Sequence, residues 1–131
     1  MMEKPSKLLE VSHQVRDGGV VVTARGELDM LTTPQLAEEL SVACTMVVAP
    51  SPVVADLREI TFMSSSAIGC LVDTHQKCAD TGTPLRIVAE DRVVRRPLDL
   101  LGLSKTLHIA DRLESALAVS TLDDAEAHAP E

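Results

Sequence analysis

The chain has 131 residues, carries a formal net charge of −8, and contains one Phe but no Trp or Tyr. This acidic balance argues against nucleic acid or a membrane surface as a partner, because both require clustered positive charge on the protein. The scarcity of aromatic rings also disfavours single-stranded nucleic acid, whose bases stack on such rings.

The length and the 45% hydrophobic content predict one globular domain with an aliphatic core. No segment has the pattern of a secretory signal and no apolar run reaches membrane-spanning length, so we expect a cytoplasmic protein. Cys44, Cys70 and Cys78 are an odd number of cysteines at no metal-site spacing, and we expect reduced thiols. No cofactor motif is present, and none is expected.

The first part of the chain predicts a β-hairpin. Residues 1–7 are polar and are expected to fray, whereas residues 8–15 alternate between apolar and polar side chains, as a half-buried strand does. Asp17-Gly18-Gly19 is a turn signal, and a β-rich run at 20–25 follows it. We expect Gly26 to end this second strand.

A helix and a buried strand are predicted next. Thr32-Thr33-Pro34 indicates a helix start with a hydroxyl cap and with Pro at the first helical position. Apolar residues recur at helical spacing as far as Val47, and Pro50-Ser51-Pro52 ends this pattern. The continuous apolar run Val53-Val54-Ala55 is typical of a strand buried on both faces.

Three consecutive serines, Ser64, Ser65 and Ser66, open the next predicted helix. A hydroxyl is a good acceptor here, since the first backbone N–H groups of a helix have no partner within it. The positive end of the helix dipole also favours an added phosphate. Helical spacing predicts a buried face made of Ile68, Val72, His75 and Ala79, with Leu71 and Cys78 beside it.

The remaining elements alternate between strand and helix. After Thr81-Gly82-Thr83-Pro84 we expect a strand at 85–89, a helix at 91–101 shortened or kinked by Pro97, an edge strand at 106–110, and a last helix from its cap Asp111 to about Val119. Strand–helix–strand crossovers require parallel pairing. The sequence therefore predicts an α/β fold, with a mixed, mainly parallel β-sheet and flanking helices in one domain at 8–119, and an acidic, disordered tail at 120–131.

Two kinds of chemistry find little support in the sequence. A serine hydrolase needs Gly on both sides of its nucleophile, which Met63-Ser64-Ser65-Ser66-Ala67 lacks, and a His and an acidic residue placed around the serines. His75 and Cys78 are three residues apart on one predicted helix, but a structural zinc needs about four ligands and no second pair is visible. We expect no catalytic residue and no metal.

Two motifs stand at a defined spacing: Gly26-Glu27-Leu28-Asp29, and Phe62-Met63-Ser64-Ser65-Ser66-Ala67-Ile68-Gly69, which follows Asp56-Leu57. Together they resemble the signature of the STAS domain, a family named for sulfate transporters and anti-sigma factor antagonists. Leu100-Leu101-Gly102-Leu103 and the order of elements also match, so the resemblance extends over residues 8–119.

The resemblance implies a non-enzymatic, partner-switching regulator. In this family a free-standing antagonist binds an anti-sigma factor of the serine-kinase type and thereby frees a sigma factor for transcription. The kinase phosphorylates a serine at this helix start, which ends the complex, and a phosphatase restores it. In the family motif Asp-Ser-Ser-Gly the acceptor directly precedes the glycine, which implies Ser66 here, with Ser65 or Ser64 as alternatives.

Two positions depart from that motif. Ser64 stands where the family has Asp, and Ala67 stands where it has Gly. Ala strengthens a helix by up to about 1 kcal/mol relative to Gly, but it adds a methyl group where a partner's backbone would approach. We expect binding to survive both departures from the motif. Phosphorylation is then slow, moves to Ser64 or Ser65, or is lost. The alternative within the family is a STAS subunit of another multi-protein sensor or lipid-transport complex, with no phosphorylation.

Helical spacing also predicts a docking face beside the serines, because small residues allow a partner helix to approach closely. This face consists of Ser66, Gly69, Cys70 and Asp73. With the motif residues, the predicted partner-binding set is Asp29, Ser64, Ser65, Ser66, Ala67, Gly69, Cys70 and Asp73. For Cys70 the alternative is a packing role, since free cysteines are often buried.

Overall fold

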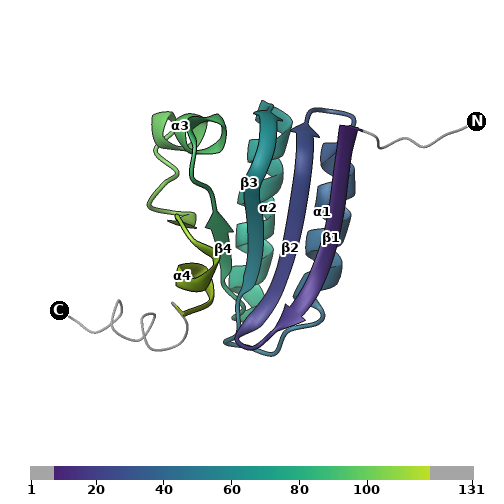
Figure 1. Cartoon of the computed structure of the whole chain (residues 1–131). Coiled ribbons are helices and arrows are strands. Elements are labelled where there is room, and N and C mark those ends of the chain that lie inside the picture. The colour runs from purple at the N-terminus through teal and green to yellow at the C-terminus, as the bar shows by residue number, and fades with distance from the viewer. Residues whose placement is uncertain (1–7, 119–131) are drawn as a thin grey trace, which may run out of the picture.

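The structure is a computed structural model, and it describes residues 8–118. Within this range the chain forms a five-stranded sheet in the order β1-β2-β3-β4-β5 (Figure 1). The elements are β1 (Leu9–Arg16), β2 (Gly19–Leu28), α1 (Thr33–Cys44), β3 (Val53–Met63), α2 (Ser65–Thr81), β4 (Leu85–Val88), α3 (Arg92–Leu100), β5 (His108–Ala110) and α4 (Leu113–Ala118). β1 pairs antiparallel with β2 and the other neighbouring strands pair parallel, which confirms the predicted fold class. The expected fraying at 1–7 and the expected tail at 120–131 lie outside the described residues.

Two apolar clusters hold the helices to the sheet. α1 and α2 lie side by side behind the sheet in Figure 1. The larger cluster fills the space between these helices and the sheet, and it includes Val22 and Ala24 of β2. α4 lies on the other face, where Val54 and Val88 pack with Ala116. The apolar start of β3 is therefore buried on both faces, as predicted. None of the helices between residues 8 and 118 combines the length and the apolar character that crossing a membrane would take.

β2 extends further than the sequence predicts. The prediction that Gly26 ends this strand is wrong, because β2 continues to Leu28 and Gly26 pairs with both Leu9 and Ile60. The backbone of Gly26 has a φ of +116°, and a Cβ there would lie 2.1 Å from the carbonyl oxygen of Leu8. The strand register shifts directly after this residue. Glycine is therefore required at an irregular point inside the strand.

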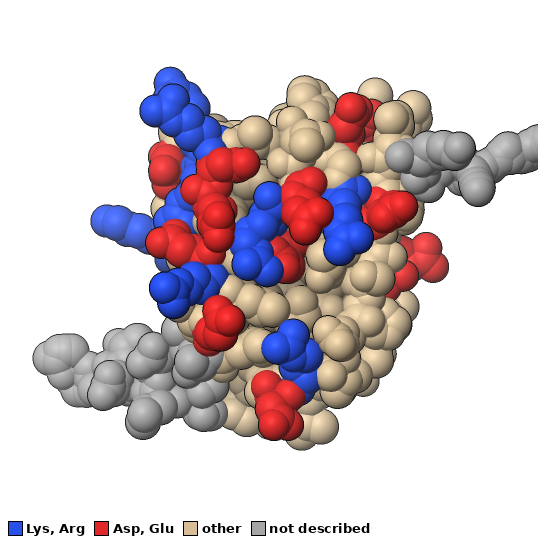
Figure 2. Space-filling model, viewed as in Figure 1, with Lys and Arg blue, Asp and Glu red and all other residues tan. Residues whose placement is uncertain are grey.

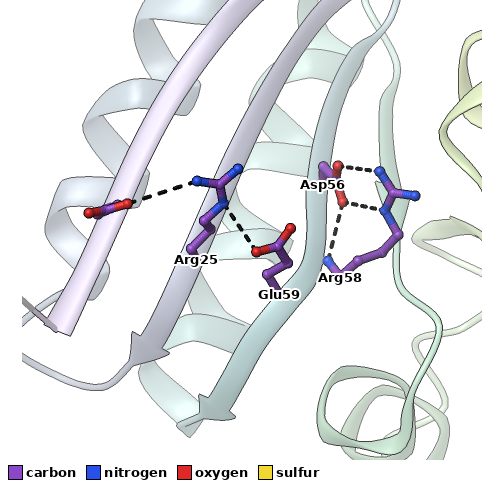
Figure 3. A network of polar contacts seen from close by, with 5 residues as sticks. Arg25, Asp56, Arg58 and Glu59 are labelled. Atoms are coloured by element: carbon purple, nitrogen blue, oxygen red, sulfur yellow. Dashed lines mark hydrogen bonds and ion pairs between the residues drawn. The ribbon is translucent and has the colours of Figure 1, made fainter.

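β3 also continues past its apolar start, through a charged stretch. Asp56 is buried, with 7% of its surface exposed, and its carboxylate accepts hydrogen bonds from Arg58 Nε at 2.9 Å and Arg58 Nη2 at 2.8 Å. These bonds raise the pKa of the Arg58 guanidinium. Beside them, Arg25 Nε of β2 lies 3.2 Å from Glu59 Oε1 of β3 (Figure 3). The charged side chains thus pair with one another on the sheet face opposite α1 and α2, where both signs are interspersed (Figure 2).

The C-terminal elements follow the predicted order with different bounds. α3 spans Arg92–Leu100 with Pro97 inside it, and β5 begins at His108, two residues later than predicted. The side chain of Asp111, which was predicted to cap the last helix, accepts a hydrogen bond from Arg95 Nη1 at 2.8 Å. This contact ties α3 to the segment before α4.

Candidate functional site

α2 begins where β3 ends, beside the C-terminal end of β2. Leu28 and Met63 are register partners at the ends of these strands, and the backbone N–H of Ser64 donates to the carbonyl oxygen of Leu28 at 2.8 Å. Ser64 has extended backbone angles, and its Oγ accepts a hydrogen bond from the N–H of Ala67 at 3.4 Å. The predicted serine cap is thus confirmed, with Ser64 as the capping residue.

The three serines have different surroundings. Ser64 is half-buried and uses its hydroxyl as the cap, whereas Ser65 is exposed and Ser66 is half-buried. Ser65 and Ser66 are the first residues of α2, so their own backbone N–H groups belong to the positive end of the helix dipole. A phosphate on either residue would lie against this end. A phosphate on Ser64 would displace the cap.

The predicted centre of the buried face of α2 is wrong by about one residue, or 100° of rotation, whereas Leu71 and Cys78, which were predicted beside that face, are buried. The buried residues of this helix are Ala67, Leu71, Thr74 and Cys78. The residues predicted for the centre of that face are half-buried or, for Ala79, exposed. Leu71 and three smaller side chains, Ala67, Thr74 and Cys78, therefore form the buried side of α2.

This rotation changes the predicted docking face. Ala67 is fully buried in the core cluster, so the expectation that its methyl group meets a partner is wrong. Gly69 and Asp73 are exposed on the outer side of α2, and a Cβ on Gly69 would meet no atom within 4 Å. Cys70 is half-buried and packs against the core cluster, and this burial raises the pKa of its thiol. The packing alternative fits Cys70 better than a docking role.

Asp29 organises the loop between β2 and α1. Its Oδ1 accepts hydrogen bonds from the N–H groups of Leu31 and Thr32, both at 2.9 Å. The bond from Thr32 is the largest of several that hold the pKa of the Asp29 carboxyl below its usual range. The Thr32 hydroxyl donates to the carbonyl oxygen of Glu27 at 2.7 Å and makes no cap bond, so the predicted hydroxyl cap of α1 is wrong.

The same loop presents two apolar side chains that the sequence analysis did not single out. Met30 and Leu31 are 72% and 83% exposed. They lie at the end of the sheet where α2 begins, because Leu28 directly precedes the loop and contacts Ser64. A signal for them exists in the sequence: a pair of large apolar residues between Asp29 and Thr32, two residue types that fold a loop through side-chain hydrogen bonds. Exposed apolar side chains beside the serine hydroxyls make this loop a candidate for contact with another protein.

We use the name serine surface for the residues at this end of the molecule together with Gly69 and Asp73, which continue along the exposed side of α2. They are Asp29, Met30, Leu31, Ser64, Ser65, Ser66, Gly69 and Asp73. Its chemistry is a set of hydroxyls at a helix start, two carboxylates and two exposed apolar side chains. This composition suits contact with another protein.

The histidines and cysteines form other contacts. His13 Nδ1 lies 3.2 Å from Glu39 Oε1, and His75 is about three turns along α2 from Ser64. Cys78 contacts the sulfur of Cys44 in α1, at 2.9 Å. In the part of the chain that the structure describes, no three His, Cys, Asp or Glu side chains gather as a metal site.

Comparisons with known proteins add four findings. The family model of the STAS domain matches residues 10–116. The anti-sigma-F factor antagonist RsfA of Mycobacterium tuberculosis is 30% identical over 115 residues, which cover 88% of this chain and 90% of the relative. The crystal structure of an anti-sigma factor antagonist from Mycobacterium paratuberculosis superposes with a TM-score of 0.77 at 30% identity, over 90% of this chain and 97% of that one. The Bacillus cell fate determinant SpoIIAA in its phosphorylated form shares the fold, with a TM-score of 0.62 at 20% identity, over 85% of this chain and 98% of that one.

Proposed function

The chain belongs to the STAS domain family, and from this premise we propose that it is an anti-sigma factor antagonist. It binds an anti-sigma factor of the serine-kinase type and thereby frees a sigma factor for transcription. Phosphorylation at the start of α2 ends the complex, with Ser66 as the first candidate and Ser65 or Ser64 as alternatives, and a phosphatase restores binding. The protein acts in the cytoplasm as a binding module, not as an enzyme.

The geometry of the α2 start is the observation that carries this proposal. Its hydroxyls lie at the positive end of the helix, next to a loop that holds Met30 and Leu31 in solvent. Apolar anchors beside a modifiable hydroxyl combine the two parts of a switch: contact area for a partner, and a position where a new charge enters that contact. The two relatives at 30% identity carry the name of antagonist, which supports the same role here.

The magnitude of the switch follows from the charge that a phosphate adds. A phosphoserine carries about −1.5 to −2 charges at pH 7. In the free protein the N–H groups of Ser65 and Ser66 would face this charge. In a packed interface its desolvation would cost several kcal/mol unless a cation met it. Complexes between micromolar and nanomolar affinity have binding free energies of about −8 to −12 kcal/mol, so a cost of this size lowers affinity by orders of magnitude.

The local electrostatics point in the same direction. Asp29 and Asp73 already place two carboxylates on the serine surface, and the whole chain carries −8. A partner that docks here must therefore present compensating positive charge. A phosphate at the start of α2 would add negative charge to this contact and change its charge balance. The phosphorylated form of SpoIIAA has the fold seen here, which supports the view that the switch alters the surface rather than the fold.

The experiment uses the full chain and candidate anti-sigma kinases. Each candidate is mixed with the protein, with and without ATP, and binding is measured together with a phosphopeptide map. We expect a complex without ATP, its loss with ATP, and phosphate on the peptide that contains Ser64–Ser66. Phosphate at another place in the chain, with the complex lost, would refute the assignment to the α2 start.

One feature favours the alternative of a STAS subunit in another multi-protein sensor or a lipid-transport complex. Ser64 and Ala67 differ from the family motif at the two positions that flank the acceptor pair. Equal binding of a partner to the serine surface with and without ATP, with no phosphate on the chain, would support this alternative, in which the chain is a subunit that is not phosphorylated.

A further inference from the structure

Two cysteines that are far apart in the sequence meet at the opposite ends of α1 and α2 from the serine surface. Cys44 is the last residue of α1, and Cys78 lies in the last turn of α2. Their sulfur atoms are 2.9 Å apart, and the two helices pack side by side behind the sheet (Figure 1). Both are free thiols in the structure.

We propose that Cys44 and Cys78 are a modification site: a thiol pair that a peroxide converts to a reversible disulfide joining α1 to α2. A disulfide bond measures about 2.05 Å. The two sulfur atoms therefore need to approach by less than about 1 Å. Side-chain rotation and small shifts at the helix ends provide such a movement without a change of fold.

The exposures of the two residues assign their roles. Cys44 is half-buried and meets the oxidant first, whereas Cys78 has no exposed surface. The Cys44 thiol loses its proton, the thiolate attacks hydrogen peroxide, and the O–O bond breaks. The products are a sulfenic acid on Cys44 and a hydroxide, which takes up that proton and becomes the first water. The sulfur of Cys78 then attacks the Cys44 sulfur, and the departing hydroxide takes the Cys78 proton as a second water. Two thiols thus lose two protons and two electrons, and one peroxide becomes two waters.

The surroundings of Cys78 set the conditions for the second step. Burial, followed by the contact with Cys44, raises the pKa of the Cys78 thiol to about 12. Little thiolate is present at neutral pH, so the reaction relies on proximity rather than on an activated nucleophile. The pair is therefore expected to close slowly at neutral pH.

The disulfide would enclose residues 45–77, a segment that contains β3 and most of α2. Cross-linking such a segment restricts the unfolded chain more than the folded one. Oxidation is therefore expected to raise Tm by about 6–20 °C. The third cysteine, Cys70, packs elsewhere on α2 and serves as a reference thiol.

The test treats the full chain and its Cys70→Ser variant with hydrogen peroxide, followed by peptide mapping and thermal unfolding. We expect both proteins to lose two hydrogens, to show linked peptides containing Cys44 and Cys78, and to gain Tm, all reversed by a dithiol reductant. Cys44→Ala, at the less buried position of the pair, should fold and show none of these changes. Overoxidised cysteines without a link, a link through Cys70, or dimers between chains would overturn the proposal.

Discussion

Substitution of Gly69 separates the stability of α2 from the docking role of its outer side. In the middle of a helix Ala is more favourable than Gly by up to about 1 kcal/mol. A Cβ at this position meets no atom within 4 Å, so no steric cost offsets the gain. For a domain of this size the expected rise in Tm of Gly69→Ala is about 3–5 °C.

A larger side chain at the same position tests the contact with a partner. Arg is also a good helix former, and it would project from α2 beside Ser65 and Ser66. Gly69→Arg should fold at least as stably as the wild type and should bind the anti-sigma factor at least about tenfold more weakly, which is a loss of about 1.4 kcal/mol. Gln76→Arg adds the same charge about two turns further along α2 and is the matched control.

Thermal unfolding and a binding titration with the partner together check this reasoning. A lower Tm for Gly69→Ala would mean that the position is not an open one in the helix. Wild-type affinity for Gly69→Arg, or equal losses for Gly69→Arg and Gln76→Arg, would mean that the outer side of α2 next to the serines is not covered in the complex.

Three further predictions concern polar contacts at the start of α2, in the Asp29 loop and on the sheet. Ser64→Ala removes the α2 cap and should lower the unfolding free energy by about 1 kcal/mol, measured in denaturant. Asp29→Ala should lower Tm, and Asp29→Asn should have an intermediate Tm because its amide oxygen can still accept hydrogen bonds. Folding depresses the pKa of Asp29, so the difference in Tm between wild type and Asp29→Ala should be largest at neutral pH and should narrow below about pH 4. Arg58→Ala leaves the buried Asp56 carboxylate without its guanidinium partner and should lower the unfolding free energy by about 1–3 kcal/mol. Arg25→Ala removes an exposed ion pair and should lower it by less than about 1 kcal/mol, and a similar loss for both variants would contradict the burial argument.

The order of elements was predictable from the sequence because it depends on local signals. Asp17-Gly18-Gly19 forms the hairpin turn, Pro34 lies in the first turn of α1, and Ser64 caps α2. Each signal acts between residues that are close in sequence, so tertiary packing has little influence on the structure that forms there. The parallel pairing of the later strands then follows from the helices between them.

The bounds of β2 and β3 were less predictable because polar residues continue both strands. Glu59 looks like a loop residue in the sequence, but it lies on the sheet face opposite α1 and α2, where it pairs with Arg25 of β2 (Figure 3). Gly26 looks like a strand end, but it is an irregular position inside β2. When one face of a strand is polar, its apolar residues alone do not show where the strand ends.

The buried face of α2 and the cysteine pair depend on tertiary contacts. Ala67 and Thr74 are weak apolar signals, and they become core residues only because a small side chain lets the helix approach the sheet. The meeting of Cys44 with Cys78 requires α1 and α2 to pack side by side, which no local pattern specifies. Asp29 was singled out from its motif, but its role in folding the loop follows from hydrogen bonds that only the structure shows.

The most direct test of the proposed switch is the affinity of the anti-sigma factor for three variants of the full chain. Ser66→Ala should bind like the wild type. Ser66→Asp should bind at least about a hundredfold more weakly, a loss of about 2.8 kcal/mol, whereas Ser41→Asp, which adds the same charge at an exposed position of α1, should bind like the wild type. Equal affinity of Ser66→Ala and Ser66→Asp, or an equal loss for Ser66→Asp and Ser41→Asp, would contradict a switch at Ser66.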